Sequence, residues 1–353
     1  MLKSWATAFL GLGTVLCVPS IGPVWADCAM EGGGEPAQAV FKFHMSSGCT
    51  ETERESHAID ASKVLTALGK GQTIDLSGVV IRGDLAFNAL QPTPNPPAID
   101  DGPIQGIQKV RMIAGGVSIM NSSVRGPVTH RAKEDVLLFV GPVSFAGTEF
   151  QQLVDLSRSV FVEPLTLSGA VFLRESYFVQ ARFHRGVLGE KTAFGPHVRF
   201  HLSRFNGPVT FQQSGFGGLA EFLETTFEQD ANFSRTYFKS GTGFSGAQFK
   251  GLADFSEALF TGDAFFTFTR FDGDAFFRRA TFRSTADFDD AEFNGREDFS
   301  KVFFEKGPQF TRAKRGISGS TVFGIENPQI QYVITLSLLV FSVLLIAYLI
   351  RSK

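Results

Sequence analysis

Two histidines of this chain have a spacing that could serve metal binding. His197 and His201 are four residues apart, which on an α-helix would place both imidazoles on one face. Phe200 stands between them and belongs to a regular Phe repeat in which the chain bends at short intervals. We therefore expect the two histidines to project from different faces and to form no metal site. The sequence also has no Ser-His-Asp, nucleotide-binding or Walker-type motif.

A group of carboxylates near the end of the same repeat is the second candidate for chemistry. It comprises Asp287, Asp289, Asp290 and Glu292, which could bind calcium or act as paired acids. The cations Arg278, Arg279 and Arg283 precede it, so a solvated surface of mixed charge is the preferred interpretation. Glu297 is unusual because it stands where the repeat normally has Ala. We predict no catalytic residue, cofactor or metal in this chain.

The element that must position all these residues is a lattice of large apolar side chains from Phe139 to Phe310. Its members are separated by gaps that alternate between six and five residues. Of the 32 positions 29 are Phe, two are Leu156 and Leu167, and one is Gly189, for which we expect the neighbouring Leu188 to substitute. Steps of five and six residues fit neither one face of an α-helix nor one face of a flat strand. The chain must therefore bend between consecutive positions.

Small residues and glycines accompany the lattice at fixed offsets. Two residues before each Phe there is usually Ala, Ser or Thr, which on a short strand faces the same way as the Phe. Glycines stand two residues into many of the six-residue gaps, and we expect them to adopt positive φ at a corner with one extra residue. These glycines are Gly141, Gly207, Gly218, Gly251, Gly262, Gly273 and Gly295, with Gly241 and Gly307 one place later.

On these units the chain resembles the pentapeptide-repeat proteins. Residues 231–234 (Ala-Asn-Phe-Ser), 253–256 (Ala-Asp-Phe-Ser) and 286–289 (Ala-Asp-Phe-Asp) match the repeat closely. The resemblance implies an all-β fold, a right-handed quadrilateral parallel β-helix with Phe and the small residue pointing inward. Four units of alternating length make a coil of 22 residues, so 172 residues would form about eight coils and a rod on the order of 38 Å long.

The 22-residue coil predicts which side chains stack. Residues 22 apart should lie above one another in four columns that form the structural core. The core residues expected are Phe233, Phe255, Phe277 and Phe299; Phe238, Phe260, Phe282 and Phe304; Phe244, Phe266, Phe288 and Phe310; and Phe227, Phe249, Phe271 and Phe293.

The N-terminus reads as a secretory signal over residues 1–26. Lys3 supplies the charged start, an apolar stretch follows, and Val24-Trp25-Ala26 resembles a cleavage site. Cys17 would be removed with it, leaving Cys28 and Cys49, for which a disulfide is the simplest expectation in an exported protein. Two free thiols are the alternative, as is a lipoprotein anchored at Cys17.

The C-terminus contains a candidate membrane span over residues 330–350. This stretch has no charged residue and is long enough to cross a bilayer as a helix. Arg351 and Lys353 follow it and suit the cytoplasmic side. We expect a linker over 311–329, a single span through the lipid bilayer and a cytoplasmic tail over 351–353. A buried helix of a soluble domain is the alternative.

The region before the lattice divides into two parts. In 27–72 apolar residues recur at helical spacing from Glu51 to Leu68, which predicts an amphipathic helix that caps the solenoid. In 73–138 the first coils begin at Ile74, and two insertions interrupt them at 88–112 and 125–135. Insertions of this kind carry binding in some solenoids and are plain spacers in others.

These observations lead to a functional hypothesis. We expect a membrane-anchored, extracytoplasmic, non-catalytic scaffold whose mature part contacts a protein or another envelope component, with no nucleic acid or small-molecule substrate as partner. One alternative is a carbohydrate-active β-helix enzyme with its site in the insertions between 88 and 138. The other is the topoisomerase-binding DNA mimicry known in the pentapeptide-repeat family. That role needs the cytoplasm and a strongly acidic stripe, whereas residues 139–310 hold 21 acidic and 17 basic residues and the whole chain has a net charge of -2.

Overall fold

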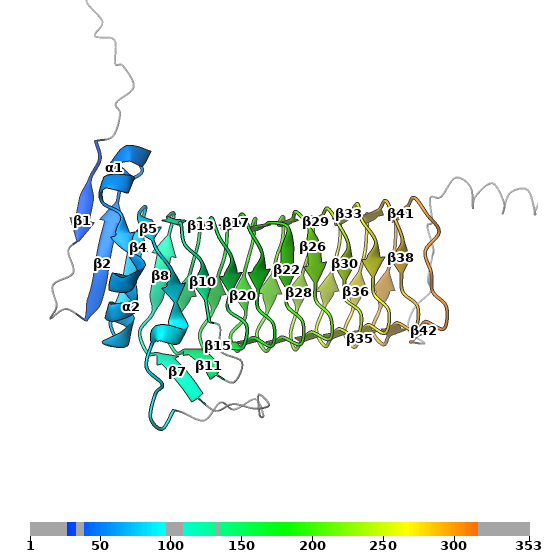
Figure 1. The fold of residues 1–353 in the computed structure, drawn as a ribbon. Coiled ribbons are helices and arrows are strands. Elements are labelled where there is room, and N and C mark those ends of the chain that lie inside the picture. Colours follow the sequence, from blue (N-terminus) through cyan, green and yellow to red (C-terminus); the bar gives the residue numbers. More distant parts are fainter. Residues whose placement is uncertain (1–26, 33–38, 97–108, 131–134, 317–353) are drawn as a thin grey trace, which may run out of the picture.

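The chain forms a parallel β-solenoid with four sheets around one core. The computed structural model describes residues 27–32, 39–96, 109–130 and 135–316. Short strands follow one another around the tube, and each pairs in parallel with the strand one coil later. Figure 1 shows the coils stacked along a single axis, with helices and outer strands at the N-terminal end. The predicted parallel β-helix is thereby confirmed.

The four sheets are called A to D in the order in which the chain visits them. Sheet A contains β1 (Met30–Gly32), β2 (Val40–Met45), β4 (Thr73–Ser77), β8 (Val117–Met120), β12 (Val143–Ser144), β16 (Leu165–Thr166), β20 (Val187–Leu188), β24 (Val209–Thr210), β28 (Ala231–Asn232), β32 (Ala253–Asp254), β36 (Ala275–Phe276) and β40 (Glu297–Asp298). Sheet B contains β3 (Ile59–Asp60), β5 (Val80–Arg82), β9 (Ser123–Val124), β13 (Glu149–Phe150), β17 (Val171–Phe172), β21 (Ala193–Phe194), β25 (Gly215–Phe216), β29 (Tyr237–Phe238), β33 (Leu259–Phe260), β37 (Thr281–Phe282) and β41 (Phe303–Phe304). Sheet C contains β6 (Leu85–Ala86), β10 (Val128–Thr129), β14 (Val154–Asp155), β18 (Ser176–Tyr177), β22 (His197–Arg199), β26 (Leu219–Glu221), β30 (Thr242–Gly243), β34 (Ala264–Phe265) and β38 (Ala286–Asp287). Sheet D contains β7 (Lys109–Ile113), β11 (Asp135–Phe139), β15 (Ser159–Phe161), β19 (Arg182–Phe183), β23 (Arg204–Phe205), β27 (Thr226–Phe227), β31 (Gln248–Phe249), β35 (Arg270–Phe271), β39 (Glu292–Phe293) and β42 (Lys314–Arg315).

The register between coils is 22 residues throughout the lattice. Phe150 pairs with Phe172, and Phe238 pairs with Phe260, so each ring lies directly above the ring of the previous coil. In the four predicted columns the ring centroids of neighbouring coils are 4.6–5.2 Å apart and the rings lie within 12° of parallel. Stacking at this distance lies at the short end of the range that aromatic pairs favour. The columns expected from the sequence are confirmed.

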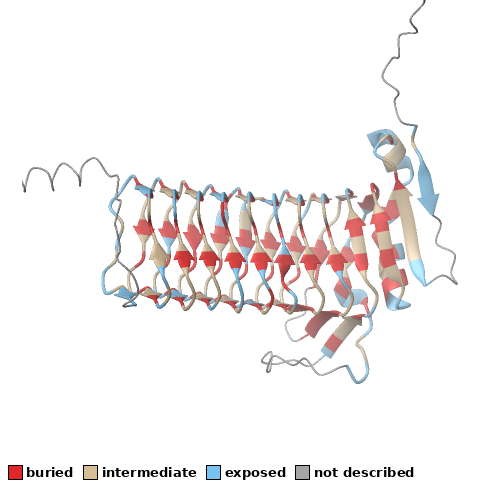
Figure 2. Cartoon of the chain, turned by 180° about the vertical axis from the view of Figure 1, so that it is seen from behind, coloured by how far each residue is buried: buried red, intermediate tan, exposed pale blue. Residues whose placement is uncertain are grey.

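The small residues two places before each Phe also face the core. Ala253, Ala275 and Ala286 are at most 1% exposed. At several positions where Thr or Ser replaces Ala, the buried hydroxyl donates to a backbone carbonyl of the preceding coil, as Thr225 does to Phe200 at 2.7 Å and Thr269 to Phe244 at 2.9 Å. Burying these two hydroxyls is therefore not penalised by an unmade hydrogen bond, whereas the hydroxyls of Ser159, Ser176 and Thr242 are buried without a hydrogen-bond partner among the described residues. Figure 2 shows buried residues on every coil along the tube.

One lattice position was predicted wrongly. Leu188 does not replace Gly189 in the core, because its side chain is on the outside and 47% exposed. Instead the ring of Phe211 moves toward the free space, so that a Cβ added to Gly189 would lie 2.6 Å from Phe211 Cδ1. Phe211 consequently stacks at a tilt of 32° on Phe233 rather than parallel to it.

The six-residue gaps hold glycine for a reason other than the predicted one. None of these nine glycines has positive φ; at Gly207, Gly251 and Gly273 a Cβ would instead lie 2.3–2.5 Å from backbone atoms of the preceding coil. Apart from Gly186, the positive φ angles of the lattice occur in the five-residue gaps, at the corners between sheets A and B and between sheets C and D. Residues with side chains adopt them there, such as Arg235 (φ 56°) and Glu257 (φ 59°). Close approach of stacked backbones, not turn geometry, selects glycine.

Both insertions open at the corner between sheets C and D. The register is 43 residues across the first coil, where Ile74 pairs with Val117, and 26 across the second, where Val117 pairs with Val143. The second insertion is thus shorter than the predicted 125–135, because Val128 is inside the core and forms β10 with Thr129. Beside the insertions β7 and β11 extend to five residues each, and their outward Val110, Val136 and Leu138 are buried as well.

The N-terminal segment contains two helices instead of the single one expected. Helix α1 (Glu51–Ser56) begins at a capping box of Thr50 and Glu53, and α2 (Ala61–Gly69) buries Val64, Ala67 and Leu68 in the main core. Between them Ile59 leaves the helical path because it pairs with Ile81 of β5. β2 also pairs in parallel with β4, while β1 pairs antiparallel with β2. The first coil therefore begins before Ile74. A 3-10 turn (Phe87–Ala89) ends the regular part of that coil.

Candidate functional site

The two histidines that could bind a metal do not belong to one site. His197 is in β22, where its Nε2 is 3.2 Å from Glu221 Oε2 and accepts from Arg199 Nε at 3.1 Å. His201 follows Phe200 at the next corner and takes no part in that cluster. In the part of the chain that the structure describes, no group of three or more His, Cys, Asp or Glu could hold a metal ion.

The carboxylate cluster is neutralised by the coil that follows it. Asp290 is bound by Arg312, whose Nε lies 2.6 Å from Oδ1, and Glu292 is bound by Lys314 at 2.6 Å. These cations lower the pKa of Asp290 and of Glu292. Asp289 accepts a backbone hydrogen bond from Thr311 at 2.6 Å. The partners therefore come from 22 residues later and not from the preceding arginines, so the cluster is a ladder of surface ion pairs.

Glu297 is the one carboxylate in the interior of the last described coils. It stands in the column of Ala253 and Ala275, and its side chain is only 7% exposed. Arg315 Nε is 3.3 Å from Oε1, yet neither carboxylate oxygen accepts a well-oriented hydrogen bond from the residues described. Burial raises the pKa of Glu297, and the charge of Arg315 opposes that effect.

A disulfide joins Cys28 to Cys49 and links the outer strands to the helical segment. Cys49 is buried in the main core, and Cys28 packs against it. The bond closes a loop between residues 21 positions apart. It fixes the position of β1 relative to the start of α1. The other predicted site residues, the column phenylalanines, are all in the core: Phe233, Phe238, Phe244, Phe249, Phe255, Phe260, Phe266, Phe271, Phe277, Phe282, Phe288 and Phe293 are at most 1% exposed.

The base of the insertions contains a small polar network. Arg111 in β7 forms an ion pair with Asp135 in β11 at 2.8 Å and also donates to the Leu90 carbonyl. His130 is 3% exposed, and its Nε2 lies 3.3 Å from the carbonyl oxygen of Asp135. Burial lowers the pKa of His130, which favours the neutral imidazole. This network ties β7 to β11 and brings one carboxylate, not a pair, to the described part of the insertions.

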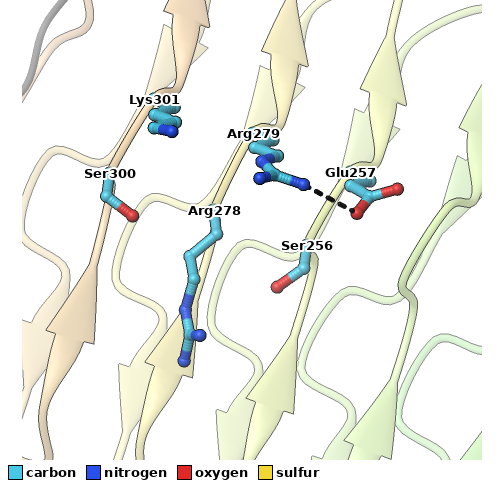
Figure 3. Close-up of a pocket in the computed structure, with 6 residues that line it drawn as sticks. All are labelled: Ser256, Glu257, Arg278, Arg279, Ser300 and Lys301. Atoms are coloured by element: carbon cyan, nitrogen blue, oxygen red, sulfur yellow. Dashed lines mark ion pairs between the residues drawn. The ribbon is translucent and has the colours of Figure 1, made fainter.

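A shallow cleft at the corner between sheets A and B was not predicted. It has a volume of about 430 Å³ and crosses three successive coils, just after β32, β36 and β40. Figure 3 shows its lining, which we call the basic cleft: Ser256, Glu257, Arg278, Arg279, Ser300 and Lys301. The sequence contains a signal for this cleft. The residue after the lattice Phe is Ser at positions 256 and 300, whereas it is Arg at position 278.

A group of apolar side chains on the outside of sheet C was also not predicted. The coil that contains β30 has three glycines, Gly241, Gly243 and Gly246. Leu219 and Leu223 of the preceding coil lean over it, 3.3 Å from a Cβ added at Gly241 and 2.9 Å from one at Gly243. Phe265, the ladder partner of Gly243 in the next coil, is 38% exposed, and Phe268 is 67% exposed. We call Leu219, Leu223, Phe265 and Phe268 the apolar patch.

The fold and its solid core define a class of protein, a repeat-built parallel β-solenoid. Residues 195–237 and 225–270 match the family model described as pentapeptide repeats (9 copies). The resemblance seen in the sequence is confirmed for this stretch, and the same spacing continues on both sides of it. No curated protein and no solved structure matches the chain.

The targeting segments expected from the sequence lie outside the described residues. This applies to the signal over 1–26 and to the membrane span over 330–350. Of the residues that the structure does describe, none belongs to a helix with the length and apolar character needed to cross a bilayer.

Proposed function

We propose that this protein is a non-catalytic scaffold that binds a protein partner through the outside of its solenoid. The observation that carries the proposal is the packing of the interior, where four files of buried side chains, Phe at all but three of the lattice positions, leave the tube filled from Phe139 onward. A ligand must therefore be recognised on the outer surface or in the insertions. Family members with this architecture generally act by surface contact rather than by catalysis, and the ladders of paired charges on the outer faces agree with that role.

The apolar patch is the part of that surface best suited to a protein partner. Exposed large apolar side chains that gather over a strip of glycines are uncommon on a surface whose other positions are mostly polar. Phe268 is the most exposed of them, and aromatic side chains that bury on association contribute strongly to binding. A protein that presents its own apolar side chains to the strip over Gly243 would remove these groups from water.

The experiment places a photocrosslinking amino acid at position 268 of the full chain in intact cells. Tyr237 on sheet B serves as the control, because it is 40% exposed and lies away from the patch. We expect a discrete protein adduct from position 268 and none of the same size from 237. Phe268→Ser should reduce recovery of that partner by about tenfold or more. A chain that crosslinks to nothing, or equally from both positions, would refute the proposal.

The proposal includes export and retention at a membrane. Residues 1–26 act as the signal, 330–350 as a single transmembrane helix and 351–353 as a cytoplasmic tail, on the sequence properties given above. The solenoid is then extracytoplasmic, where a disulfide between Cys28 and Cys49 is chemically suited. Protease added from each side of intact membranes tests this, since residues 27–329 should be cut only from the extracytoplasmic side.

We also assign a capping role to the N-terminal segment. Helix α2 contributes Val64, Ala67 and Leu68 to the core at the start of the first coils. β1, which pairs on the outer side of β2, has only three residues, so the strand edge that could pair with another chain is short. Together these elements limit association of the solenoid through its first coil.

The alternatives have less support from the described residues. A glycosidase needs two carboxyl groups on either side of the scissile bond, whereas Asp135 at the base of the insertions is held by Arg111. Deleting residues 88–112 and finding that a hydrolytic activity disappears would revive the enzyme. A DNA mimic needs an uncompensated acidic stripe, whereas Glu257, Asp290 and Glu292 have basic partners one coil away.

A further inference from the structure

The basic cleft contains more positive than negative charge. Three of its six lining residues are cations, and Glu257 is its one anion. Arg278 is already engaged, since its Nε is 2.7 Å from Asp298 and its guanidinium lies 4.4 Å from the centre of the Phe276 ring. The remaining question is which groups neutralise Arg279 and Lys301.

Arg279 and Lys301 have weak or no compensation among the described residues. Glu257 accepts a hydrogen bond from Arg235 Nε at 3.0 Å, while Arg279 Nη1 is 3.7 Å from the other carboxylate oxygen. Lys301 forms no ion pair in the described part of the chain and is exposed. Two other cations at equivalent corners are hydrogen-bonded to a carboxylate one coil away, as Arg312 is to Asp290 and Arg235 is to Glu257. The cleft is therefore a place where the ladder of ion pairs is incomplete.

The hydroxyl groups of the cleft complete a set of hydrogen-bond donors. In Figure 3 Ser256 and Ser300, on the two outer coils, both point their hydroxyls toward the middle coil that carries Arg278 and Arg279. Neighbouring coils are about 4.8 Å apart, so donors from three coils can reach the oxygens of one tetrahedral anion. A guanidinium can bind such an anion through two parallel hydrogen bonds, and a lysine adds a point charge.

From this arrangement we infer that the basic cleft binds a phosphate or sulfate group. Arg279 and Lys301 supply charge, and Ser256 and Ser300 donate from the two sides. Glu257 limits affinity because its negative charge lines the same cleft. The site is at a different corner from the apolar patch, and the inference stands whether or not the proposed protein partner exists. The group is carried either by a small anion in solution or by an anionic phospholipid.

Calorimetric titration of the full chain in a neutral detergent distinguishes these sources. One arm uses inorganic phosphate, a second uses inorganic sulfate, and a third uses dihexanoyl phosphatidylglycerol with the zwitterionic, net-neutral dihexanoyl phosphatidylcholine as the comparison. We expect a dissociation constant of about 1 mM or tighter in at least one anionic arm, weakening as salt is added. Binding of the phosphatidylglycerol alone identifies a headgroup site, and binding of the inorganic ions identifies a site for free anions.

The decisive variant is the double substitution Arg279→Gln with Lys301→Gln. Glutamine already occupies equivalent left-handed corner positions at Gln180 and Gln213, so the backbone tolerates it. We expect affinity to fall by about tenfold or more, equivalent to ~1.4 kcal/mol. Arg296→Gln is the matched control, because Arg296 is an exposed arginine paired with Asp274 outside the cleft. It should change affinity less than about twofold.

A second variant predicts a change of opposite sign. Glu257→Gln removes the anion of the cleft and should tighten binding by about two- to fivefold, a result that loss of folding cannot produce. The inference is overturned if no anionic arm shows a dissociation constant of about 1 mM or tighter. It is equally overturned if the double variant binds like the wild type, if Arg296→Gln loses as much affinity as the double variant, or if Glu257→Gln weakens binding.

Discussion

Substituting Gly273 tests why the solenoid needs glycine at its six-residue corners. Turn geometry and close backbone approach both favour glycine, but they predict different responses to Ala and Asn. A Cβ at residue 273 would lie 2.3 Å from the Gly251 carbonyl oxygen, 2.5 Å from its carbon and 3.1 Å from the Lys250 oxygen. All three are backbone atoms, so no side chain can rotate out of the way.

The size of the effect follows from the separation that Ala would force. Relieving the contact requires the two coils to move apart by roughly 1 Å, since heavy atoms in contact are usually more than 3 Å apart. Two hydrogen bonds join the same coils beside Gly273, from Asp272 to Phe249 at 2.7 Å and from Ala253 to Asp274 at 2.8 Å. Overpacking costs about 1–3 kcal/mol, and each weakened bond about 0.5–1.5 kcal/mol. We expect Gly273→Ala to destabilise by roughly 2–6 kcal/mol in total.

The assay is equilibrium denaturation followed by circular dichroism, with hydrogen exchange of the coils around residue 273 as a local measure. Gly215→Ala is the control, because nothing lies within 4 Å of an added Cβ there, and its stability should change by less than about 0.5 kcal/mol. Gly273→Asn should be worse than Gly273→Ala. At Gly246, where φ is +70°, the order should reverse because Asn tolerates this conformation. A Gly273→Ala variant as stable as the wild type, or Asn better than Ala at 273, would refute the close-approach explanation.

Three further predictions concern the core and the two ends. Phe255→Ala should destabilise by about 3–5 kcal/mol and Phe255→Leu by less than about 1.5 kcal/mol, measured by denaturation; equal losses would contradict ring packing as the cause. Because burial raises the pKa of Glu297, the native state holds its proton more tightly than the unfolded chain, and stability falls as pH rises above the ordinary value of 4.5. Glu297→Ala should therefore gain about 1–3 kcal/mol at pH 7 and little at pH 4, and an equal gain at both pH values would argue against a buried charge. Cys49→Ser should lower the stability of the N-terminal coils by about 3 kcal/mol, seen as faster hydrogen exchange over 40–82 with no change over 139–310; faster exchange in both regions would contradict independent opening of the first coils.

The fold could be predicted from the sequence because one spacing rule repeats without interruption. An inward Phe such as Phe255 is surrounded by lattice members from the coils before and after it, so an error in register would misplace every ring at once. The coil length, the inward Ala column and the stacking of Phe233 on Phe255 could all be predicted for this reason. The first coils were harder, since β2 and β3 have no Phe lattice and join the sheets through ordinary apolar residues such as Ile59.

Features that depend on contacts between coils could not be predicted from the sequence of a single coil. Gly273 looks like a turn residue in sequence, and only the stacked backbone at Gly251 reveals the need for close approach. Leu188 was expected to fill the gap at Gly189, but Phe211 from the following coil fills it. Helix α1 and helix α2 were expected as one, because the pairing of Ile59 with Ile81 is a long-range contact.

The separation of inward and outward positions explains where function can vary on this fold. Inward positions hold Phe or a small or aliphatic residue in nearly every coil, and a charged departure such as Glu297 carries a stability cost. Outward positions contact mainly residues of their own and the adjacent coils, through ion pairs such as Arg235 with Glu257. A change on the outer surface of one coil therefore affects at most the neighbouring coils and leaves the core unchanged. Both surface sites arise in this way, the basic cleft from Arg279 and Lys301, which occupy the corner position that Glu257 holds in the coil before them, and the apolar patch from a coil that contains Gly243.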